Sequence, residues 1–203
     1  HDIRLPFPDD EEHFDTLIHL AGNPSAKSCI ENPGSAVYDN IVGTYNVLEY
    51  ARKKRIRQCI YFSTCEVYNG NLDATETDVP TCTNMYAASK LSGEHIFEAY
   101  LKSYDFMQSC TVFRLIHSYG KYCQDDRFAS HVIKRFENET SPHFILKTRH
   151  PKRWISTDEI CTYTETLMNA SESGFRVYNL VGRDNLTLEQ FIHKMSNGKP
   201  FTV

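Results

Sequence analysis

A tyrosine and a lysine four residues apart, Tyr86 and Lys90, are the residues whose types and spacing most directly suggest chemistry. The run around them, Asn84–Glu94, has no proline and is flanked by good helix formers, so we expect a helix. A helix places the two side chains one turn apart on one face, where the ammonium group stabilises a phenolate and lets the tyrosine act as a base. Such a pair could take a proton from an alcohol while a hydride leaves the same carbon. Alternatively, it is one of the many chance pairs on helix surfaces.

A second polar group stands at the end of a predicted strand. The apolar run at Tyr61 and Phe62 ends in Ser63 and Thr64, and a turn follows. Because open α/β sheets bind their ligands at the carboxyl ends of the strands, we expect these two hydroxyl groups at a ligand crevice.

Thr64, Tyr86 and Lys90 together resemble the Ser/Thr…Tyr-x-x-x-Lys triad of the extended short-chain dehydrogenase/reductase family, the NAD-dependent epimerases and dehydratases of nucleotide sugars. Other stretches resemble the motifs of that family in the same order. They are Asp15–Gly22 (D-x-x-x-H-x-A-[AG]), Asn40–Thr44 (N-x-x-G-T), Arg114–Gly120 (R-x-x-N-x-Y-G), and Tyr178–Gly182 followed by Thr187–Gln190. The resemblance runs from about Asp15 to Met195.

The resemblance implies a mechanism and a set of site residues. Tyr86 would remove a proton from a sugar hydroxyl, Lys90 would keep Tyr86 ionised and bind the nicotinamide ribose, and Thr64 would hold the reacting oxygen. The result would be a transient 4-keto sugar. The implied cofactor is NAD, with NADP also open, and the positions that match its lining are Leu20, Ala21, Gly22, Asn40, Ser63, Tyr86, Lys90 and Ile116. On the residues alone, Asn40 could equally be a plain polar residue in a helix and Ser63 a strand-end cap.

The residues after Thr64 bear on the outcome of the reaction. The run Ser63–Tyr68 is similar to the dehydratase and UDP-glucuronate decarboxylase branches of the family, which makes Glu66 a further candidate catalytic residue; it is otherwise an exposed residue without a role. Family dehydratases carry Asp and then Glu after the threonine, whereas this chain has Cys65 in place of the Asp. The resemblance therefore favours 4-epimerisation or decarboxylation over 4,6-dehydration.

Two departures from the family touch the diphosphate of a nucleotide-diphosphate sugar, the implied substrate. His117 stands where the family usually has Asn, and Lys152-Arg153 stands where Arg-Asp is usual. Hydrogen-bond donors or positive charge are kept, so we expect these three residues, with Thr64, to bind the substrate. A structural role suits His117 equally well.

The family opens with a glycine-rich turn, G-x-x-G-x-x-G, that brings the pyrophosphate of the cofactor to a helix N-terminus. This sequence contains no such turn and starts about two βα units late. A truncated sequence, a second chain that supplies the missing half, or a non-catalytic family fragment that binds a partner or a sugar nucleotide without NAD would each explain the absence. The intact triad argues against the third.

Apolar and helical patterns alternate along the chain. We expect strands at 14–21, 58–62, 110–115 and 144–146, and helices at 34–52, from 84, at 128–137, from 156 and from 187. This order predicts an α/β fold: a Rossmann-like parallel sheet with flanking helices, lacking its N-terminal glycine-rich βαβ, plus a small C-terminal substrate-binding part. Residues 1–125 would form the partial NAD-binding domain, and 126–203 a segment for substrate binding and the end of the sheet.

Composition and charge indicate which partners and which compartment to expect for the protein. The 203 residues carry a net charge of −4, which gives no reason to expect nucleic acid or an anionic membrane as partner, and no run of 18 apolar residues occurs. Seven cysteines without a C-x-x-C pair argue against a zinc site and a disulfide framework, and they favour a reducing, cytoplasmic compartment. The basic run 52–55 is expected as a solvated helix end, with a phosphate patch as the alternative. The family resemblance also implies a homodimer formed through the helices that contain Asn40 and Tyr86.

Overall fold

The structure is a computed structural model that describes residues 1–71, 73–120, 123, 127–146, 148–170 and 172–203. It divides into two compact units, His1–Leu115 with Thr166–Asn179, and Ile116–Glu165 with Leu180–Val203. The boundary expected between 125 and 126 lies outside the described residues. The assignment of the two segments to cofactor and substrate remains a prediction.

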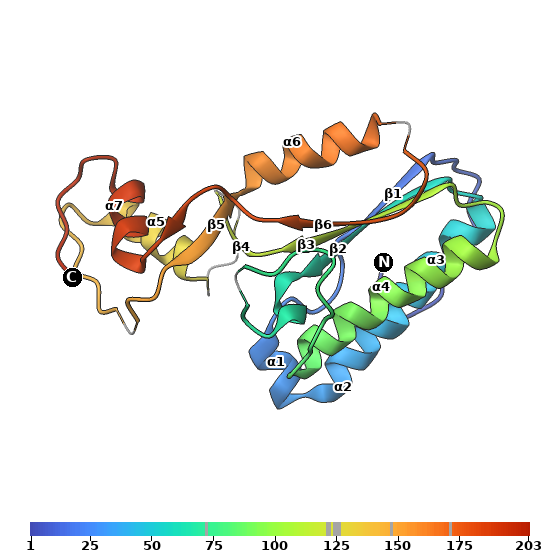
Figure 1. The fold of residues 1–203 in the computed structure, drawn as a ribbon, viewed down its shortest axis with the longest axis horizontal. Helices are drawn as coiled ribbons and strands as arrows, with labels where there is room; N and C mark the ends of the chain where they lie inside the picture. Colours follow the sequence, from blue (N-terminus) through green and yellow to red (C-terminus); the bar gives the residue numbers. More distant parts are fainter. Residues whose placement is uncertain (72, 121–122, 124–126, 147, 171) are drawn as a thin grey trace. The chain divides into compact units, whose positions relative to one another are not determined.

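The first helix or strand begins at Thr16, and strands and helical segments follow one another from there to Ser196 (Figure 1). In chain order they are β1 (Thr16–His19), α1 (Ala26–Glu31), α2 (Pro33–Ser35), a π-helical segment (Ala36–Val42), α3 (Gly43–Lys54), β2 (Gln58–Thr64), a 3-10 turn (Cys65–Tyr68), α4 (Met85–Ser103) and β3 (Ser109–Leu115). After these come β4 (His117–Tyr119), α5 (Phe128–Asn138), β5 (Lys152–Ser156), α6 (Thr157–Met168), β6 (Gly174–Leu180), β7 (Asn185–Leu186) and α7 (Leu188–Ser196).

The main sheet has the strand order β1-β2-β3-β6, and β1, β2 and β3 are paired in parallel. The register places Ile18 beside Ile60, and Ile60 beside Thr111. Parallel neighbours need a crossover, and helices supply it between β1 and β2 and between β2 and β3. The predicted α/β class with a Rossmann-like parallel sheet is confirmed.

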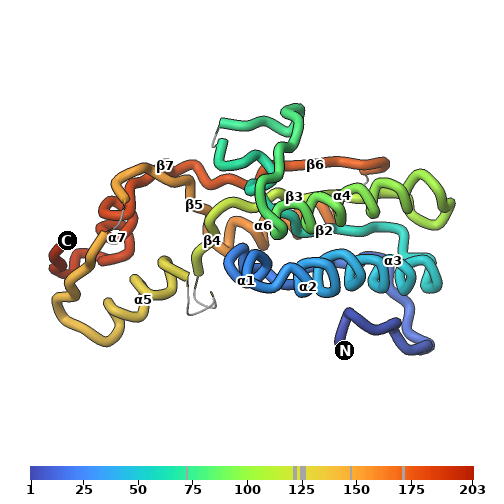
Figure 2. The backbone as a smooth tube through the Cα atoms, turned by 90° about the horizontal axis from the view of Figure 1, so that it is seen from below, coloured from blue at the N-terminus to red at the C-terminus, as the bar shows by residue number. Residues whose placement is uncertain are grey.

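Helices α3 and α4 run side by side on one face of this sheet (Figures 1 and 2). Their inner faces meet β2 and β3 in the main hydrophobic core, which removes apolar surface from water. The buried members of the core are Leu48, Ala51, Ile56, Cys59, Tyr61, Phe97, Phe106, Met107, Cys110 and Val112.

A glycine lets α4 approach β2 closely. A Cβ atom added to Gly93 would lie 2.3 Å from the phenolic oxygen of Tyr61 and 2.7 Å from the ring carbon that bears it. Glycine in the middle of a helix normally destabilises it by about 1 kcal/mol relative to alanine. Here the missing side chain makes room for the ring of Tyr61.

The second unit is built around a small sheet in the order β4-β5-β7. Trp154 on β5 stacks on Phe191 of α7, with ring centroids 4.0 Å apart, and Phe136 packs against Phe144 and Phe201. The helices expected from 156 and from 187 are both present, and Thr187 and Gln190 form the reciprocal bonds of a capping box.

The strand expected at 144–146 is wrong. Phe144 donates its backbone N–H to the Thr202 carbonyl at 2.9 Å, and the only pairing there in the described part of the chain is a single bridge between His143 and Thr202. Phe144 and Leu146 instead pack in the core beside α5, whereas Ile145 is exposed.

The acidic segment near the start of the chain neutralises the basic end of α3. Lys53 lies 3.2 Å from Asp9, Lys54 pairs with Asp10, and Arg52 pairs with Glu49 within the helix. Because carboxylates already occupy these cations, a solvated helix end describes this run better than a phosphate patch. None of the helices that the structure describes is long and apolar enough to cross a membrane.

Replacing Gly93 by alanine tests the close approach of α4 to β2. We expect Gly93→Ala to lower the free energy of unfolding by about 1–2 kcal/mol, because the overpacking cost outweighs the gain in helix propensity. Tyr61→Phe in the same chain should restore part of this loss, since the nearest atom is the phenolic oxygen. Urea unfolding of the two single variants and the double variant measures the coupling, and purely additive effects would contradict the predicted contact.

Candidate active site

Ser63 and Thr64 are the last two residues of β2. Thr64 is buried and begins the 3-10 turn, where its hydroxyl oxygen accepts the backbone N–H of Glu66 at 3.2 Å. Because this bond uses a lone pair of the oxygen, the hydroxyl proton of Thr64 stays available for a ligand.

Helix α4 carries Tyr86 and Lys90, as the sequence predicts. Asn84 caps the helix by accepting the backbone N–H of Ala87 at 2.9 Å, which fixes where its first turn begins. Tyr86 is half-buried and Lys90 is only 7% exposed. The expected pair therefore stands one helical turn apart at the base of the helix.

The ammonium group of Lys90 rests on an aromatic ring. Its Nζ lies 4.4 Å from the centroid of the Tyr61 ring, and in the described residues it takes part in no hydrogen bond or ion pair. Burial lowers the pKa of Lys90 to about 8, and the charge of Glu94 opposes that shift. A buried cation with unused donors is suited to holding a ligand's hydroxyl groups.

A buried ion pair fixes α4 to the strands beneath it. Glu94, one turn beyond Lys90, accepts the guanidinium of Arg114 on β3 through both carboxylate oxygens, with Nη2 to Oε2 at 2.6 Å. The same carboxylate accepts the hydroxyl of Ser63 at 2.5 Å. Glu94 and Arg114 are nearly fully buried, and the pair joins α4, the end of β2 and β3.

The same arginine reaches the chain beyond β2. Arg114 donates to the hydroxyl of Tyr68, which in turn donates to Asn179 Oδ1 on β6 at 3.1 Å. Asn179 also bonds the backbone of Ala74 in the loop that precedes α4. The carboxyl ends of β2, β3 and β6 are thus held in one polar network.

Asn40 links the loop after β1 to α4. Its amide oxygen accepts the backbone N–H of Asn23 at 2.7 Å, and its amide nitrogen donates to Ser89 at 2.9 Å. The Ser89 hydroxyl donates to the carbonyl of Tyr86. Asn40 is therefore a buried connector within the π-helical segment, a helix type often found at functional sites, and not a plain surface residue.

A threonine and a histidine extend this network to the end of β1. Thr44 donates to the carbonyl of Asn40 at 2.6 Å, and His19 Nε2 lies 3.0 Å from the same threonine oxygen. Since the only proton of Thr44 is used, the histidine must donate, which assigns the proton to Nε2. Burial and then the charge of Lys90 lower the pKa of His19 to about 3, so the ring stays neutral.

The three residues after β1 that match the cofactor lining are open to solvent. Leu20, Ala21 and Gly22 are exposed at the carboxyl end of the strand. Gly22 has φ of +139°, and a Cβ atom there would lie 2.5 Å from the amide oxygen of Asn40. Only glycine suits both this backbone conformation and this close approach.

Cys65 and Glu66 differ in environment. Cys65 donates its thiol to the carbonyl of Arg114 at 3.1 Å, and burial raises its pKa to about 12. The thiol therefore stays protonated and bonded near neutral pH. Glu66 is exposed, and Asn84 donates to it at 3.4 Å.

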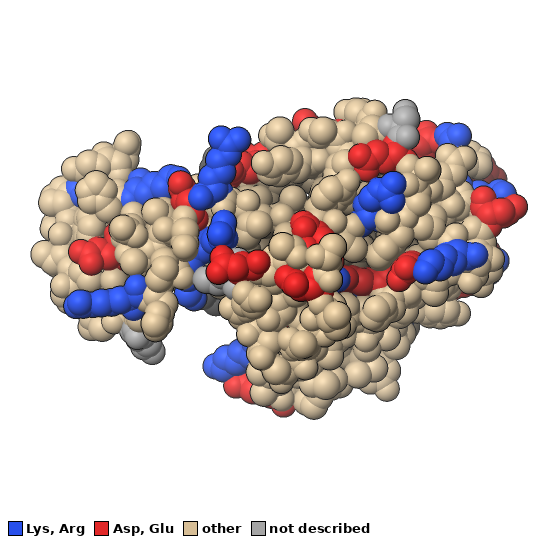
Figure 3. Space-filling model, viewed as in Figure 1, with Lys and Arg blue, Asp and Glu red and all other residues tan. Residues whose placement is uncertain are grey.

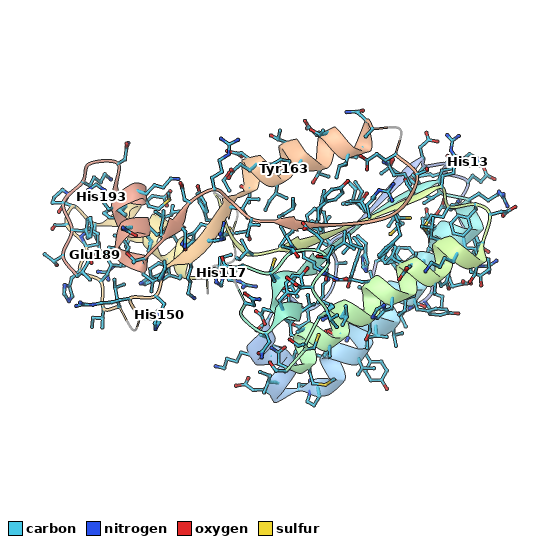
Figure 4. All side chains as sticks on the ribbon, viewed as in Figure 1. His13, His117, His150, Tyr163, Glu189 and His193 are labelled. Carbon is cyan, nitrogen blue, oxygen red and sulfur yellow. The ribbon has the colours of Figure 1, made fainter. Side chains whose placement is uncertain are left out.

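The other predicted ligand residues belong to the second unit. His117 lies on β4 (Figure 4), with its ring centroid 5.5 Å from that of Trp154, and Ile116 donates its backbone N–H to Leu180. Lys152 and Arg153 lie on β5, paired with Leu186 and Asn185 of β7. Loss of hydration, followed by the charges of Lys152 and Arg127, lowers the pKa of His117, although the residue keeps an exposed edge.

Sequence reasoning missed several residues that support the site. They are Tyr61 beneath Lys90, Thr44 and Ser89 in the Asn40 network, and the pair Glu94 and Arg114. A signal for the pair was present: Glu94 repeats the four-residue spacing of Tyr86 and Lys90, and Arg114 is a charge in an otherwise apolar strand. Because an unpaired buried charge is costly, two charged residues at buried positions are expected to pair with each other. No cluster of His, Cys, Asp or Glu suited to a metal occurs within the described residues.

Comparison with known proteins gives the class of the protein. The model of the NAD dependent epimerase/dehydratase family matches residues 6–182. The chain therefore belongs to this family, as the motifs predict.

Curated relatives share part of their length with this chain. The dTDP-glucose 4,6-dehydratase of Mycobacterium tuberculosis is 24% identical over 195 residues, which cover 92% of this chain and 57% of the relative. The human dTDP-D-glucose 4,6-dehydratase is 30% identical over 138 residues, or 67% of this chain and 37% of the relative. The chain thus spans about half the length of the first of these proteins.

Solved structures show the same fold. RMD from Pseudomonas aeruginosa, complexed with NADPH, matches 100% of this chain and 74% of its own with a TM-score of 0.84 at 18% identity. MoeE5 in complex with UDP-glucuronic acid and NAD matches 92% of this chain and 63% of its own with a TM-score of 0.79, also at 18% identity.

The buried His19 predicts a pH-dependent stability. The unfolded chain binds a proton at this ring below pH 6.5, whereas the folded chain does so only near pH 3, so stability falls as the pH drops through this window. His19→Gln keeps a donor for Thr44 and cannot titrate. Between about pH 7 and about pH 5.5 the parent should lose about 1 kcal/mol more unfolding free energy than the variant, as measured by urea unfolding. Equal losses in both chains would show that His19 is accessible to protons in the folded state.

Proposed function

We propose that the protein is an NAD-dependent enzyme that converts a nucleotide-diphosphate sugar through a transient 4-keto intermediate, as a 4-epimerase or a UDP-glucuronate decarboxylase-like enzyme. One observation carries this proposal: Tyr86 stands one turn from Lys90, a buried ammonium group whose donors are unused among the described residues. Membership of the epimerase/dehydratase family supports the choice of substrate and cofactor.

The residues present fit the nicotinamide half of NAD or NADP. Lys90 has donors for the hydroxyl groups of a ribose, and the exposed Leu20–Gly22 loop follows β1, with Gly22 packed closely against Asn40. Asn40 and Ser63 would contribute by holding this loop and α4 in place, and Ile116 would line the cofactor as the family resemblance implies. The bound cofactor would accept a hydride from the sugar and return it.

In the first step Tyr86, as a phenolate, would remove the proton of the sugar 4-hydroxyl as the hydride leaves the same carbon. The positive charge of Lys90 favours the phenolate. Thr64 would donate its free proton to the reacting oxygen and so fix its position. When the hydride returns, Tyr86 would give the proton back.

The environment of Cys65 favours outcomes that expel no hydroxyl group. In a 4-epimerisation the hydride returns to the other face of the 4-keto group, and no further acid is needed. In a decarboxylation the bond between C5 and C6 would break, CO2 would leave, the electron pair of that bond would move into the neighbouring 4-keto group, and C5 would then take up a proton. Loss of water would need an acid at position 65, and the bonded thiol does not supply one. Glu66, exposed beside the site, is the remaining candidate for a second proton transfer.

We assign the diphosphate of the substrate to His117, Lys152 and Arg153. The two cations lie next to each other on β5, and His117 pairs with Trp154 on the same strand. Cationic and N–H donors at these positions suit phosphate oxygens. In the solved relatives UDP-glucuronic acid and UDP-glucose are bound in complexes of this fold.

A second reading follows from the sequence, which contains no G-x-x-G-x-x-G turn. On that reading the chain is a non-catalytic family member that binds a partner or a sugar nucleotide without NAD. Calorimetric titration of the chain with NAD⁺ and with NADP⁺, before any sugar is added, separates the two. Micromolar binding supports the enzyme. The absence of binding would fit either the second reading or a sequence that is a fragment, and the catalytic assignment would then apply only to a longer chain.

Tyr86→Phe tests the catalytic assignment. If the chain turns over UDP-glucose or UDP-glucuronate with NAD⁺, the variant should lose about 10²–10⁴-fold in kcat, because the proton acceptor is gone. Calorimetric binding of NAD⁺ and of the sugar nucleotide should change little. Tyr104→Phe, at the far end of α4, serves as the matched control and should keep the parent rate. A Tyr86→Phe variant as fast as the parent would end the proposal.

We also propose a homodimer formed through α3, α4 and the π-helical segment. Few charged side chains cover α2 and the N-terminal half of α4 in Figure 3, and Val37, Tyr38 and Tyr45 are exposed along the neighbouring helical run. Burying such an apolar face would favour association with a second copy. A reducing, cytoplasmic location remains our expectation from the cysteine pattern.

Tyr38→Glu tests the dimer. A carboxylate on this face should weaken the association by at least about tenfold, because it would be desolvated in the interface. Sedimentation equilibrium of the parent and the variant measures the effect. Tyr163→Glu on α6 places the same charge at another exposed tyrosine and should leave the mass unchanged. A monomeric parent would contradict the proposal.

A further inference from the structure

Among the residues that the structure describes, none with an acidic side chain is in direct contact with the ammonium group of Lys90. The nearest carboxylate on its own helix, Glu94, is committed to Arg114 and Ser63. His19, which faces Lys90 from β1, is neutral. Tyr86, one turn earlier, carries charge only when it is ionised. What remains in contact with the ammonium group is the face of the Tyr61 ring, 4.4 Å from Nζ.

Tyr61 is held in one position from several sides. Its ring packs against those of His19 and Phe97, with centroids 5.4 and 4.9 Å away, those two rings lie 6.1 Å from each other, and the residue is fully buried. Its hydroxyl group donates to the backbone carbonyl of Lys90 at 3.3 Å. The missing side chain of Gly93 leaves room for that hydroxyl.

One side chain therefore contacts Lys90 twice, at the backbone through its hydroxyl and at the ammonium group through its ring. An aromatic face attracts a cation through its quadrupole, and the attraction grows when both partners are removed from water. The hydroxyl group of Tyr61 fixes the position of the Lys90 backbone, and the ring of Tyr61 fixes the position of the Lys90 ammonium group.

We propose that Tyr61 is a positioning residue that seats the ammonium group of Lys90 on its ring and keeps it charged one turn from Tyr86. The catalytic consequence rests on the proposed function, since it is Lys90 that would favour the Tyr86 phenolate. The seat itself is a property of the folded chain and requires no cofactor or sugar.

The contact with Tyr61 matters because the protonation state of Lys90 is easily shifted. Burial lowers the pKa of this lysine to about 8, close to neutral pH, so a modest change in stabilisation decides how much of it is charged. Loss of an aromatic face should lower the pKa by about one further unit, a tenfold change in the protonation equilibrium.

The test is the titration of Lys90 in the full chain, labelled with ¹³C at the lysine side chains and followed by NMR at the Cε carbon. Tyr61→Phe keeps the ring face and should leave the midpoint within a few tenths of a unit. Replacing Tyr61 by 3,4,5-trifluorophenylalanine keeps the shape of that ring but weakens its negative face, and should lower the midpoint by about half a unit or more. Phe97→Leu removes a ring that packs on Tyr61 but is not the partner of the ammonium group, and should leave the midpoint unchanged.

Comparison of the phenylalanine and trifluorophenylalanine chains decides the proposal, because the two rings differ in charge distribution far more than in size. A lower midpoint in the fluorinated chain supports the aromatic seat, and equal midpoints overturn it. Tyr61→Leu adds a second measurement and should lower the midpoint by about one unit. Since these titrations use no substrate, they judge the seat even if Tyr86→Phe shows that the proposed reaction does not take place.

Discussion

The buried ion pair between Glu94 and Arg114 is the interaction on which the arrangement of the site depends. It joins α4 to the end of β2 through Ser63 and to β3 through the arginine itself. Removing one partner of such a pair leaves a charge buried without compensation, which typically costs about 3–5 kcal/mol. The pair thus acts less as a source of net stability than as a constraint on how α4 can lie on the sheet. Thr64 and Lys90 are each adjacent, in the strand or in the helix, to a member of this network.

A second series of hydrogen bonds also fixes α4, by joining it to β1 and to the π-helical segment. It runs from His19 through Thr44 and Asn40 to Ser89, and it ends at the carbonyl of Tyr86. Each hydroxyl and amide in it has a definite donor or acceptor, which is why the tautomer of His19 can be assigned. The loop that would face the cofactor and the first turn of α4 are therefore fixed to each other. Lys90 is a member of neither network as described, and its ammonium group lies over the ring of Tyr61.

The environment of Cys65 bears on the proposed choice between dehydration and the other outcomes. The relatives named as 4,6-dehydratases share the fold family of this chain, but a fold does not determine which bond breaks after the first oxidation. That choice lies with the few groups around the keto intermediate. Cys65 is protonated and bonded to a backbone carbonyl, so the group beside Thr64 holds its proton too tightly to serve as an acid near neutral pH. An outcome that needs only Tyr86, Lys90 and Thr64 agrees with this environment.

The sequence by itself determined the α/β class, the helix that carries Tyr86 and Lys90, the strand that ends at Thr64 and the family. These follow from local spacing: period-four pairs on a helix, hydroxyl residues at the end of an apolar run, and caps such as Asn84 and Thr187. It could not decide the strand at 144–146, because an apolar run reads alike whether it pairs with a strand or fills a core. Nor could it decide the partners of buried polar groups. Tyr61 beneath Lys90, Glu94 with Arg114 and Asn40 with Ser89 join residues 20 to 49 positions apart in the sequence, and only the packing of α4 on the sheet brings each pair within bonding distance. A buried polar group must take whatever partner the tertiary structure places beside it, and that partner is set by the fold and not by neighbours in the chain.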